Sequence, residues 1–451
     1  MGFSRAILFV LVPLFLASLL SPSAVRAQEV DRIWGRVLTV SGEVHEGFIR
    51  WDRNEASWVD LLDGSKDSPQ FQYKDWWRLA HPDDQQRDRV IELAGYRITW
   101  DDDEPDFPSS HESGIRIGHV RRLEVTGDDR ALLTLRSGKV VELEGGSTDL
   151  GGDLREVLVK TSRGDVVELE WENLETVEFM DAPPGADAGS QRLHGTVEPK
   201  EGPSFTGYIS WDTNDILTSD TLDGDDSEGR QREILFGRIA AIRPTGDGSE
   251  ITLSNGDRME LSGSDDVDSG NDGIQVSDPG LGLVDMDWDE IERVRFHPPE
   301  VAVGLDAFDG GHRLRGTVVT ADSTEVSGLI RWDGDEEYSW ELLDGWDGGV
   351  SFDIEFAHIA TIEKYIGQNV TVNVGPTGVS VSHPVKEGAQ VTLRDGRVFE
   401  LFDSNDVDES NNGVFVLEAG SGSSPDDLEA EWVMVKWEDF RTLRFEWEEG
   451  R

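Results

Sequence analysis

Apolar and polar residues alternate along many short runs of this chain, and a period of two is typical of half-buried β-strands. Val37 and Thr39 share one face of the first run, and Ile49 and Trp51 share one face of the next run. The runs are rich in Val, Ile, Thr and Trp, and turn dipeptides such as Asn-Gly and Asp-Gly separate them. The pattern therefore predicts an all-β chain.

One string of residues occurs three times. The copies begin at Arg32, Arg192 and Arg313 and align without a gap: RIWGRVLTVSGEVHEGFIRWD, RLHGTVEPKEGPSFTGYISWD and RLRGTVVTADSTEVSGLIRWD. Each copy ends in Trp-Asp, and an Asp-Gly pair follows it. A second set of matching strings comes later: LRSGKVVEL, LSNGDRMEL and LRDGRVFEL. This self-similarity predicts three tandem repeats, each made of two halves.

The spacing of these strings sets the predicted domain boundaries. The middle repeat is compact, whereas the first and third carry insertions at 65–113 and 365–388. Segments rich in Pro, Gly and Ala separate the repeats, and we interpret them as linkers. The predicted division is a signal peptide over 1–27, followed by β repeats over 28–181, 192–298 and 313–449.

The first half of each repeat resembles the first motif of Sm-type small β-barrels. In the first copy, the residues that carry the resemblance are Gly42, Gly47, Ile49, Asp52, Leu61 and Gly64. Because SH3-like barrels share this geometry, the resemblance implies tandem small β-barrels of the Sm or SH3-like kind, one for each half-repeat. The RNA-binding role of the Sm family does not carry over, because its second motif is absent and the chain is strongly acidic.

The N-terminus has the features of a secretory signal peptide. Arg5 precedes an apolar stretch, and small residues around Arg26 predict cleavage between Ala27 and Gln28. No later stretch is apolar enough to predict membrane insertion. The chain has no cysteine, so it has neither a lipid attachment site of the lipobox kind nor a disulfide. We therefore expect a periplasmic or secreted protein.

The formal net charge of -51 argues against nucleic acid as a partner, because the phosphate backbone would be repelled. Two interpretations of the acidity stay open. The acidity either serves solubility or adaptation to salt, or it provides a field that attracts a cation or a basic partner.

Two polar loops in the second halves are candidate calcium sites. They read SDDVDSGNDG and SNDVDESNNG, and oxygen-rich loops of this kind suit a hard cation. Their spacing is not that of an EF-hand, and Asp and Asn also favour ordinary turns. Either a calcium site or a plain turn fits the residues, and the candidate ligands are Asp266, Asp268, Asn271, Asp272, Asp406, Asp408, Asn411 and Asn412.

Tryptophan beside a carboxylate is a second candidate feature, because an indole stacks on a sugar ring while the carboxylate accepts its hydrogen bonds. The repeated Trp-Asp pairs are more simply explained as core residues. The residues of the first insertion occur only once, so the repeat fold does not require them, and insertions often lie on a binding face. The candidate ligand-binding residues there are Trp76, Trp77, Trp100 and Asp101.

No catalytic motif occurs in the sequence: there is no G-x-S-x-G, no H-E-x-x-H, no phosphate loop and no dinucleotide fingerprint. We therefore expect an exported, non-enzymatic binding or scaffold protein, with a protein or polysaccharide of the cell envelope as its partner. The alternative is a carbohydrate-binding or calcium-dependent adhesion module, with calcium as the one cofactor to consider.

Overall fold

The computed structural model describes residues 30–67, 90–93, 96–99, 110–145, 148–367, 371–374, 379–382, 386–426 and 430–447. In these ranges the regular structure is strand, interrupted only by three-residue 3-10 turns, so the prediction of an all-β chain is confirmed. These turns are η3 (Ile117–His119), η4 (Gly151–Asp153), η5 (Trp171–Asn173), η6 (Phe236–Arg238), η7 (Asp265–Val267), η8 (Trp288–Glu290), η9 (Leu305–Ala307) and η10 (Phe356–His358). The predicted signal peptide lies outside the described residues.

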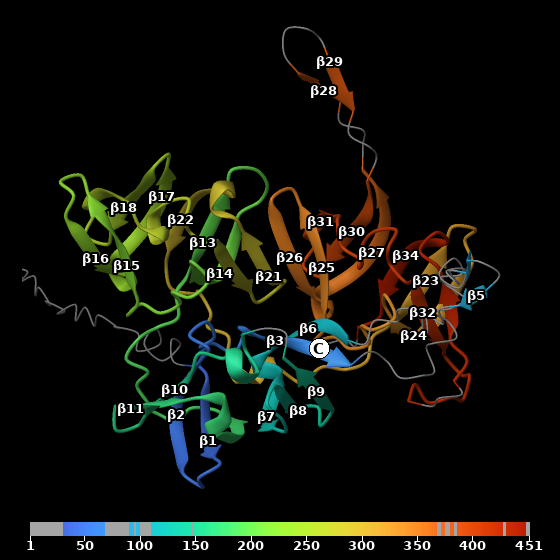
Figure 1. Cartoon of the computed structure of the whole chain (residues 1–451), viewed down its shortest axis with the longest axis horizontal. Coiled ribbons are helices and arrows are strands. Elements are labelled where there is room, and N and C mark those ends of the chain that lie inside the picture. Colours follow the sequence, from blue (N-terminus) through green and yellow to red (C-terminus); the bar gives the residue numbers. More distant parts are fainter. Residues whose placement is uncertain are drawn as a thin grey trace, which may run out of the picture.

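Three large antiparallel sheets hold most of the strands (Figure 1). The first sheet has the order β11 (Val166–Leu169), β10 (Val157–Thr161), β2 (Val44–Trp51), β1 (Trp34–Thr39), β12 (Leu174–Phe179), β7 (Val120–Val125), β8 (Arg130–Leu135), β9 (Val140–Glu144), β3 (Leu61–Asp67) and β6 (Ser110–Arg116). The second has the order β16 (Gln231–Leu235), β15 (Thr221–Asp226), β19 (Arg258–Ser262), β18 (Gly248–Leu253), β17 (Ile239–Thr245), β22 (Ile291–Phe296), β13 (His194–Pro199), β14 (Phe205–Trp211), β20 (Ile274–Asp278), β21 (Gly282–Met286), β26 (Val350–Glu355) and β25 (Leu342–Asp347).

The third sheet has the order β31 (Val398–Leu401), β30 (Glu387–Leu393), β27 (Ile359–Ile366), β34 (Phe440–Phe445), β23 (Arg315–Thr320), β24 (Glu325–Arg331), β32 (Val414–Glu418) and β33 (Val433–Val435). Two hairpins stand apart from the large sheets, each within one of the predicted insertions. They are β4 (Val90–Leu93) with β5 (Tyr96–Thr99), and β28 (Thr371–Val374) with β29 (Val379–Ser382).

The described sheets are open rather than closed into barrels, so the expectation of small closed barrels is not confirmed. The second sheet also contains strands from both the second and the third matching segments. β21 of the second pairs with β26 of the third, with Val284 opposite Phe352. The second and third segments consequently share one hydrophobic core. The core of the first segment is separate from it but also takes in Tyr208 and Trp340.

The tryptophans of the three Trp-Asp pairs are buried in these cores and make the same hydrogen bond. Each indole Nε1 donates to the backbone carbonyl of an aspartate about 55 to 100 residues later, over 2.9–3.0 Å. The donor and acceptor pairs are Trp51 and Asp149, Trp211 and Asp266, and Trp332 and Asp406. The structure therefore supports the interpretation of these tryptophans as core residues.

The segments interpreted as linkers are packed against the first segment. Leu305 and Phe308 belong to its core, and the backbone N–H of Gly310 donates to His119 Nδ1 over 3.1 Å. Ala188 packs on Trp34 in a small satellite cluster. These segments therefore fasten the sheets together instead of joining independent units by free chain.

Glycines allow close approach of neighbouring strands at one matching position. An added Cβ at Gly47, Gly207 or Gly328 would meet a backbone carbonyl oxygen of the adjacent strand. At Gly207 this is the oxygen of Ser277, which the sheet cannot move without breaking the pairing of β14 with β20.

We expect Gly207→Ala to lower the free energy of unfolding by about 2–4 kcal/mol, because the clash is with backbone. Gly246→Ala is the matched control, since nothing lies within 4 Å of its added Cβ. Urea unfolding should show a change of less than about 0.5 kcal/mol for the control. Equal midpoints for the two variants would contradict the packing described for β14.

Candidate functional site

In each of the three matching segments, an aspartate carboxylate accepts a hydrogen bond from the backbone of the Asp-Gly pair that follows the Trp-Asp pair. Asp149 Oδ2 accepts the N–H of Asp63 over 2.7 Å. The matching bonds join Asp266 to the N–H of Asp223 over 2.6 Å, and Asp406 to the N–H of Asp344 over 2.8 Å. These aspartates therefore tie the second half of each segment to its first half.

A second carboxyl group faces each of these aspartates. It belongs to the residue four positions after the tryptophan, which is Glu55, Asp215 or Glu336. A tight turn lets the backbone N–H of this residue donate to the tryptophan carbonyl over 2.9–3.1 Å. Burial, followed by the charge of Asp149, raises the pKa of Glu55 well above its usual value. Burial and the charge of Asp266 raise the pKa of Asp215 to about 8. Carboxyl groups are thus crowded in the same way at all three positions.

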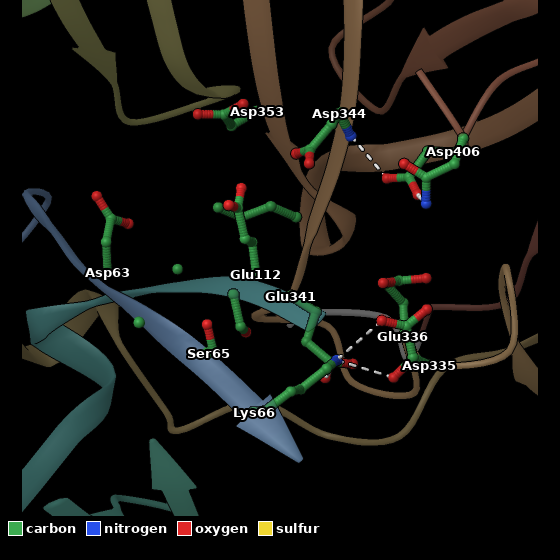
Figure 2. Close-up of a pocket in the computed structure, with 15 residues that line it drawn as sticks. Asp63, Ser65, Lys66, Glu112, Asp335, Glu336, Glu341, Asp344, Asp353 and Asp406 are labelled. Atoms are coloured by element: carbon green, nitrogen blue, oxygen red, sulfur yellow. Dashed lines mark hydrogen bonds and ion pairs between the residues drawn. The ribbon is translucent and has the colours of Figure 1, made fainter. Parts of the chain in front are cut away.

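At the third position the crowding opens into a pocket of about 560 Å³ between β3 and β6 on one side and β25 with its preceding turn on the other. Figure 2 shows acidic side chains arranged around this space, from both sides. We name it the acidic pocket. Its acidic lining residues are Asp63, Glu112, Asp335, Glu336, Glu341, Asp344, Asp353 and Asp406.

The carboxyl groups of the acidic pocket hold their protons more tightly than usual. Burial, followed by the charges of Asp344 and Glu112, raises the pKa of Asp63 to about 6. Burial raises the pKa of Asp344 to about 6 as well, with the charge of Asp335 adding to it. Burial, Asp344 and Asp63 raise the pKa of Asp353 well above its usual value. Asp63 and Asp344 are nevertheless exposed residues, because they face the pocket.

Lys66 is the only basic residue among the described residues that line the acidic pocket. Its Nζ donates to Glu341 Oε1 over 2.6 Å and to the backbone carbonyl of Asp335 over 2.9 Å. Burial lowers the pKa of Lys66, but the charges of Glu341 and Asp335 outweigh it and raise the pKa above its usual value. Lys66 is therefore a charged ammonium held by two neighbouring acidic residues.

Glu336 is the buried carboxyl group in the acidic pocket whose hydrogen bonding is incomplete. The residue is 8 % exposed, and its Oε2 has no hydrogen-bond partner among the described residues. Burial, followed by the charges of Asp335 and Asp406, raises its pKa well above the usual value. A buried acceptor without a donor costs free energy, so a donor that enters the pocket would be stabilising.

Four of the eight residues of the candidate calcium loops hold local turns, and the other four bond to residues far away in sequence. Asp268 and Asp408 accept N–H groups two residues ahead, at Gly270 and Ser410, and Asn271 and Asn411 accept those of Gly273 and Gly413. The N–H groups of Asp272 and Asn412 donate to the carboxylates of Asp212 and Asp333. Asp266 and Asp406 make the bonds given above, and Asp406 alone of the eight lines the acidic pocket.

Within the described ranges, no group of three or more His, Asp or Glu side chains is arranged to hold a metal ion. Calcium binding by the two loops therefore stays a prediction. Trp76, Trp77, Trp100 and Asp101 lie outside the described residues, so their role as ligand-binding residues also stays a prediction.

Sequence reasoning missed most of the acidic pocket. The Asp-Gly pairs were visible as matching turn signals, and they contain Asp63 and Asp344. Glu336 could have been found from its fixed distance of four residues from Trp332, which Glu55 and Asp215 share with their own tryptophans.

Comparison with known proteins adds no relative: no protein-family model, curated protein or solved structure matches this chain. No helix in the described part of the chain is long and apolar enough to cross a membrane.

Proposed function

We propose that this chain is an exported, non-enzymatic binding protein, and that its acidic pocket holds a cationic ligand. The observation that carries the proposal is the lining itself: eight carboxyl groups against one lysine, with the buried Glu336 Oε2 unpaired among the described residues. A chain that keeps crowded, partly desolvated carboxyl groups loses stability by doing so, and a bound cation offsets that loss.

The rest of the proposal follows the sequence. The predicted signal peptide supports a periplasmic or secreted location, and the absence of catalytic motifs supports binding over catalysis. The equivalent tryptophan hydrogen bonds support our proposal that the three segments are tandem copies of one β module. The partner we propose is a protein or polysaccharide of the envelope that carries positive charge, since the acidic surface repels nucleic acid.

Thermal unfolding of the mature protein tests the proposal. We expect a multivalent cation, tested as calcium, magnesium or spermidine, to raise the melting temperature by roughly 5 °C beyond sodium chloride at matched ionic strength. The shift should shrink in Glu336→Gln, which removes one carboxyl group from the pocket and keeps the size of the side chain.

Glu325→Gln is the matched control, because Glu325 is exposed on β24 and does not line the pocket. It removes one carboxyl group outside the pocket, so it should keep the full shift. Equal shifts in all salts would mean that the ions only screen the surface, and the proposed function would then be wrong.

A further inference from the structure

We propose that the cationic groups held by the acidic pocket are alkylammonium groups, those of a polyamine or of lysine side chains on a partner protein. The inference rests on the proposed function and names its ligand class. A recognition site for ammonium groups is distinct from a site for one metal ion, and three features of the pocket separate the two.

The first feature is that the acidic pocket already holds one alkylammonium group. Lys66 extends from β3 across to the opposite wall, 275 residues away in sequence, and its ammonium reaches Glu341 and Asp335 (Figure 2). An ammonium has three N–H donors, and a carboxylate paired with a backbone carbonyl suits it. The contact of Lys66 is therefore an internal example of the recognition that we propose.

The second feature is the spread of the carboxyl groups. Figure 2 shows Asp63 and Asp353 on the far side of the space from Glu336 and Asp406. The described residues contain no set of three acidic side chains that could ligate one ion together. A volume of about 560 Å³ also exceeds the needs of one ion and is within the range of small-molecule sites. A ligand with several ammonium groups along a flexible chain could reach carboxylates on both walls.

The third feature is the contrast with the two matching positions. Nine residues after the tryptophan, Asp60 is bound by Arg192 through two hydrogen bonds of 3.1 Å, and Asp220 by Arg50 through two of 3.0 Å. The guanidinium group donates one N–H to each of the two carboxylate oxygens. At the third position the equivalent residue is Glu341, and it is bound by the single ammonium of Lys66 instead.

The neighbouring space also differs in size. The pocket beside Glu55 measures about 110 Å³, against about 560 Å³ beside Glu336. The third position therefore has more room for further ammonium groups than the first.

Isothermal titration calorimetry of the mature full-length protein tests the inference. The probes are spermidine, tetralysine, calcium chloride and magnesium chloride, at constant ionic strength. We expect spermidine or tetralysine to bind one saturable site, and Glu336→Gln to weaken that binding about tenfold or more. Glu325→Gln should leave it unchanged. Binding of tetralysine without spermidine would assign the ammonium groups to a partner protein, and binding of spermidine alone to a free polyamine.

Lys66→Met gives a sharper test. If the ammonium of Lys66 occupies an ammonium site, removing it should free that site for the ligand. The affinity for spermidine should then rise about tenfold. Should Lys66→Met fail to fold, Glu112→Gln replaces it, because Glu112 is an exposed residue on β6 that lines the pocket, and it should weaken binding.

The outcomes separate the two proposals. Calcium or magnesium binding that is weakened by Glu336→Gln, with no binding of either ammonium probe, would overturn the inference and leave the proposed function standing. No binding of any cation would overturn both.

Discussion

Trp332→Ala should lower the free energy of unfolding by about 3–5 kcal/mol. The indole is 0 % exposed, its ring meets Phe440 with centroids 5.3 Å apart, and its Nε1 bonds the carbonyl of Asp406. The substitution removes this packing, leaves a cavity and frees a backbone carbonyl. Chemical unfolding followed by circular dichroism measures the loss.

Trp346→Ala is the matched control for this change, because Trp346 is 43 % exposed on β25. It should cost less than about 1 kcal/mol. A loss for Trp332→Ala no larger than that for Trp346→Ala would contradict the placement of the Trp-Asp tryptophans in the core.

Five carboxyl groups with raised pKa values should make the protein more stable as the pH falls from about 8 to about 5. They outnumber His194 and His358, whose pKa burial lowers to about 4 and which act in the opposite direction. Burial raises the pKa of Asp31, Asp63, Asp266 and Asp344 to about 6, and that of Asp215 to about 8. In the unfolded chain these groups titrate near pH 4, so between the two values the folded protein binds more protons. Their contribution is complete below about pH 4 and is lost as the pH rises through 6 to 8.

We expect a rise in melting temperature of roughly 5 °C across this interval, measured by differential scanning calorimetry. The double variant Asp63→Asn, Asp344→Asn mimics the protonated groups, so it should be more stable at pH 8 and show a smaller rise. Asp247→Asn, at an exposed turn, should keep the full rise. A wild-type melting temperature that falls between pH 8 and pH 5 would contradict the raised pKa values of these carboxyl groups.

Local features of the fold could be read from the sequence, because they depend on neighbouring residues. The alternation around Ile49 and Trp51 predicts a strand where β2 lies, and the matching glycines lie where a neighbouring strand approaches closely. One requirement of the fold explains why the tryptophan occurs in all three copies, which predicts a core position. The three tryptophans are indeed buried.

The arrangement of the sheets could not be predicted in the same way. Pairing of β26 with β21 depends on contacts between residues far apart in sequence, which no local pattern reports. The same holds for Leu305 and Phe308, whose surroundings of Pro, Gly and Ala favoured a linker, although both side chains are buried. Composition described the backbone of this segment correctly but not where its apolar residues pack.

The acidic pocket escaped prediction for a related reason. Its walls come from β3 and β6 and from the turn before β25, so Lys66 and Glu341 meet across 275 residues. In a chain with 92 acidic residues, no single carboxylate stands out until the fold brings a set of them together. The loops around Asp268 and Asp408 stood out by composition, yet their oxygens serve their own turns.

A crystal structure of the mature protein grown at neutral pH with saturating spermidine would test the central claim most directly. We expect continuous density for the ligand in the acidic pocket, with ammonium nitrogens about 3 Å from the carboxylates of Glu336, Asp344 and Asp406. A pocket that holds only water under these conditions, or spermidine bound elsewhere on the surface, would contradict the account.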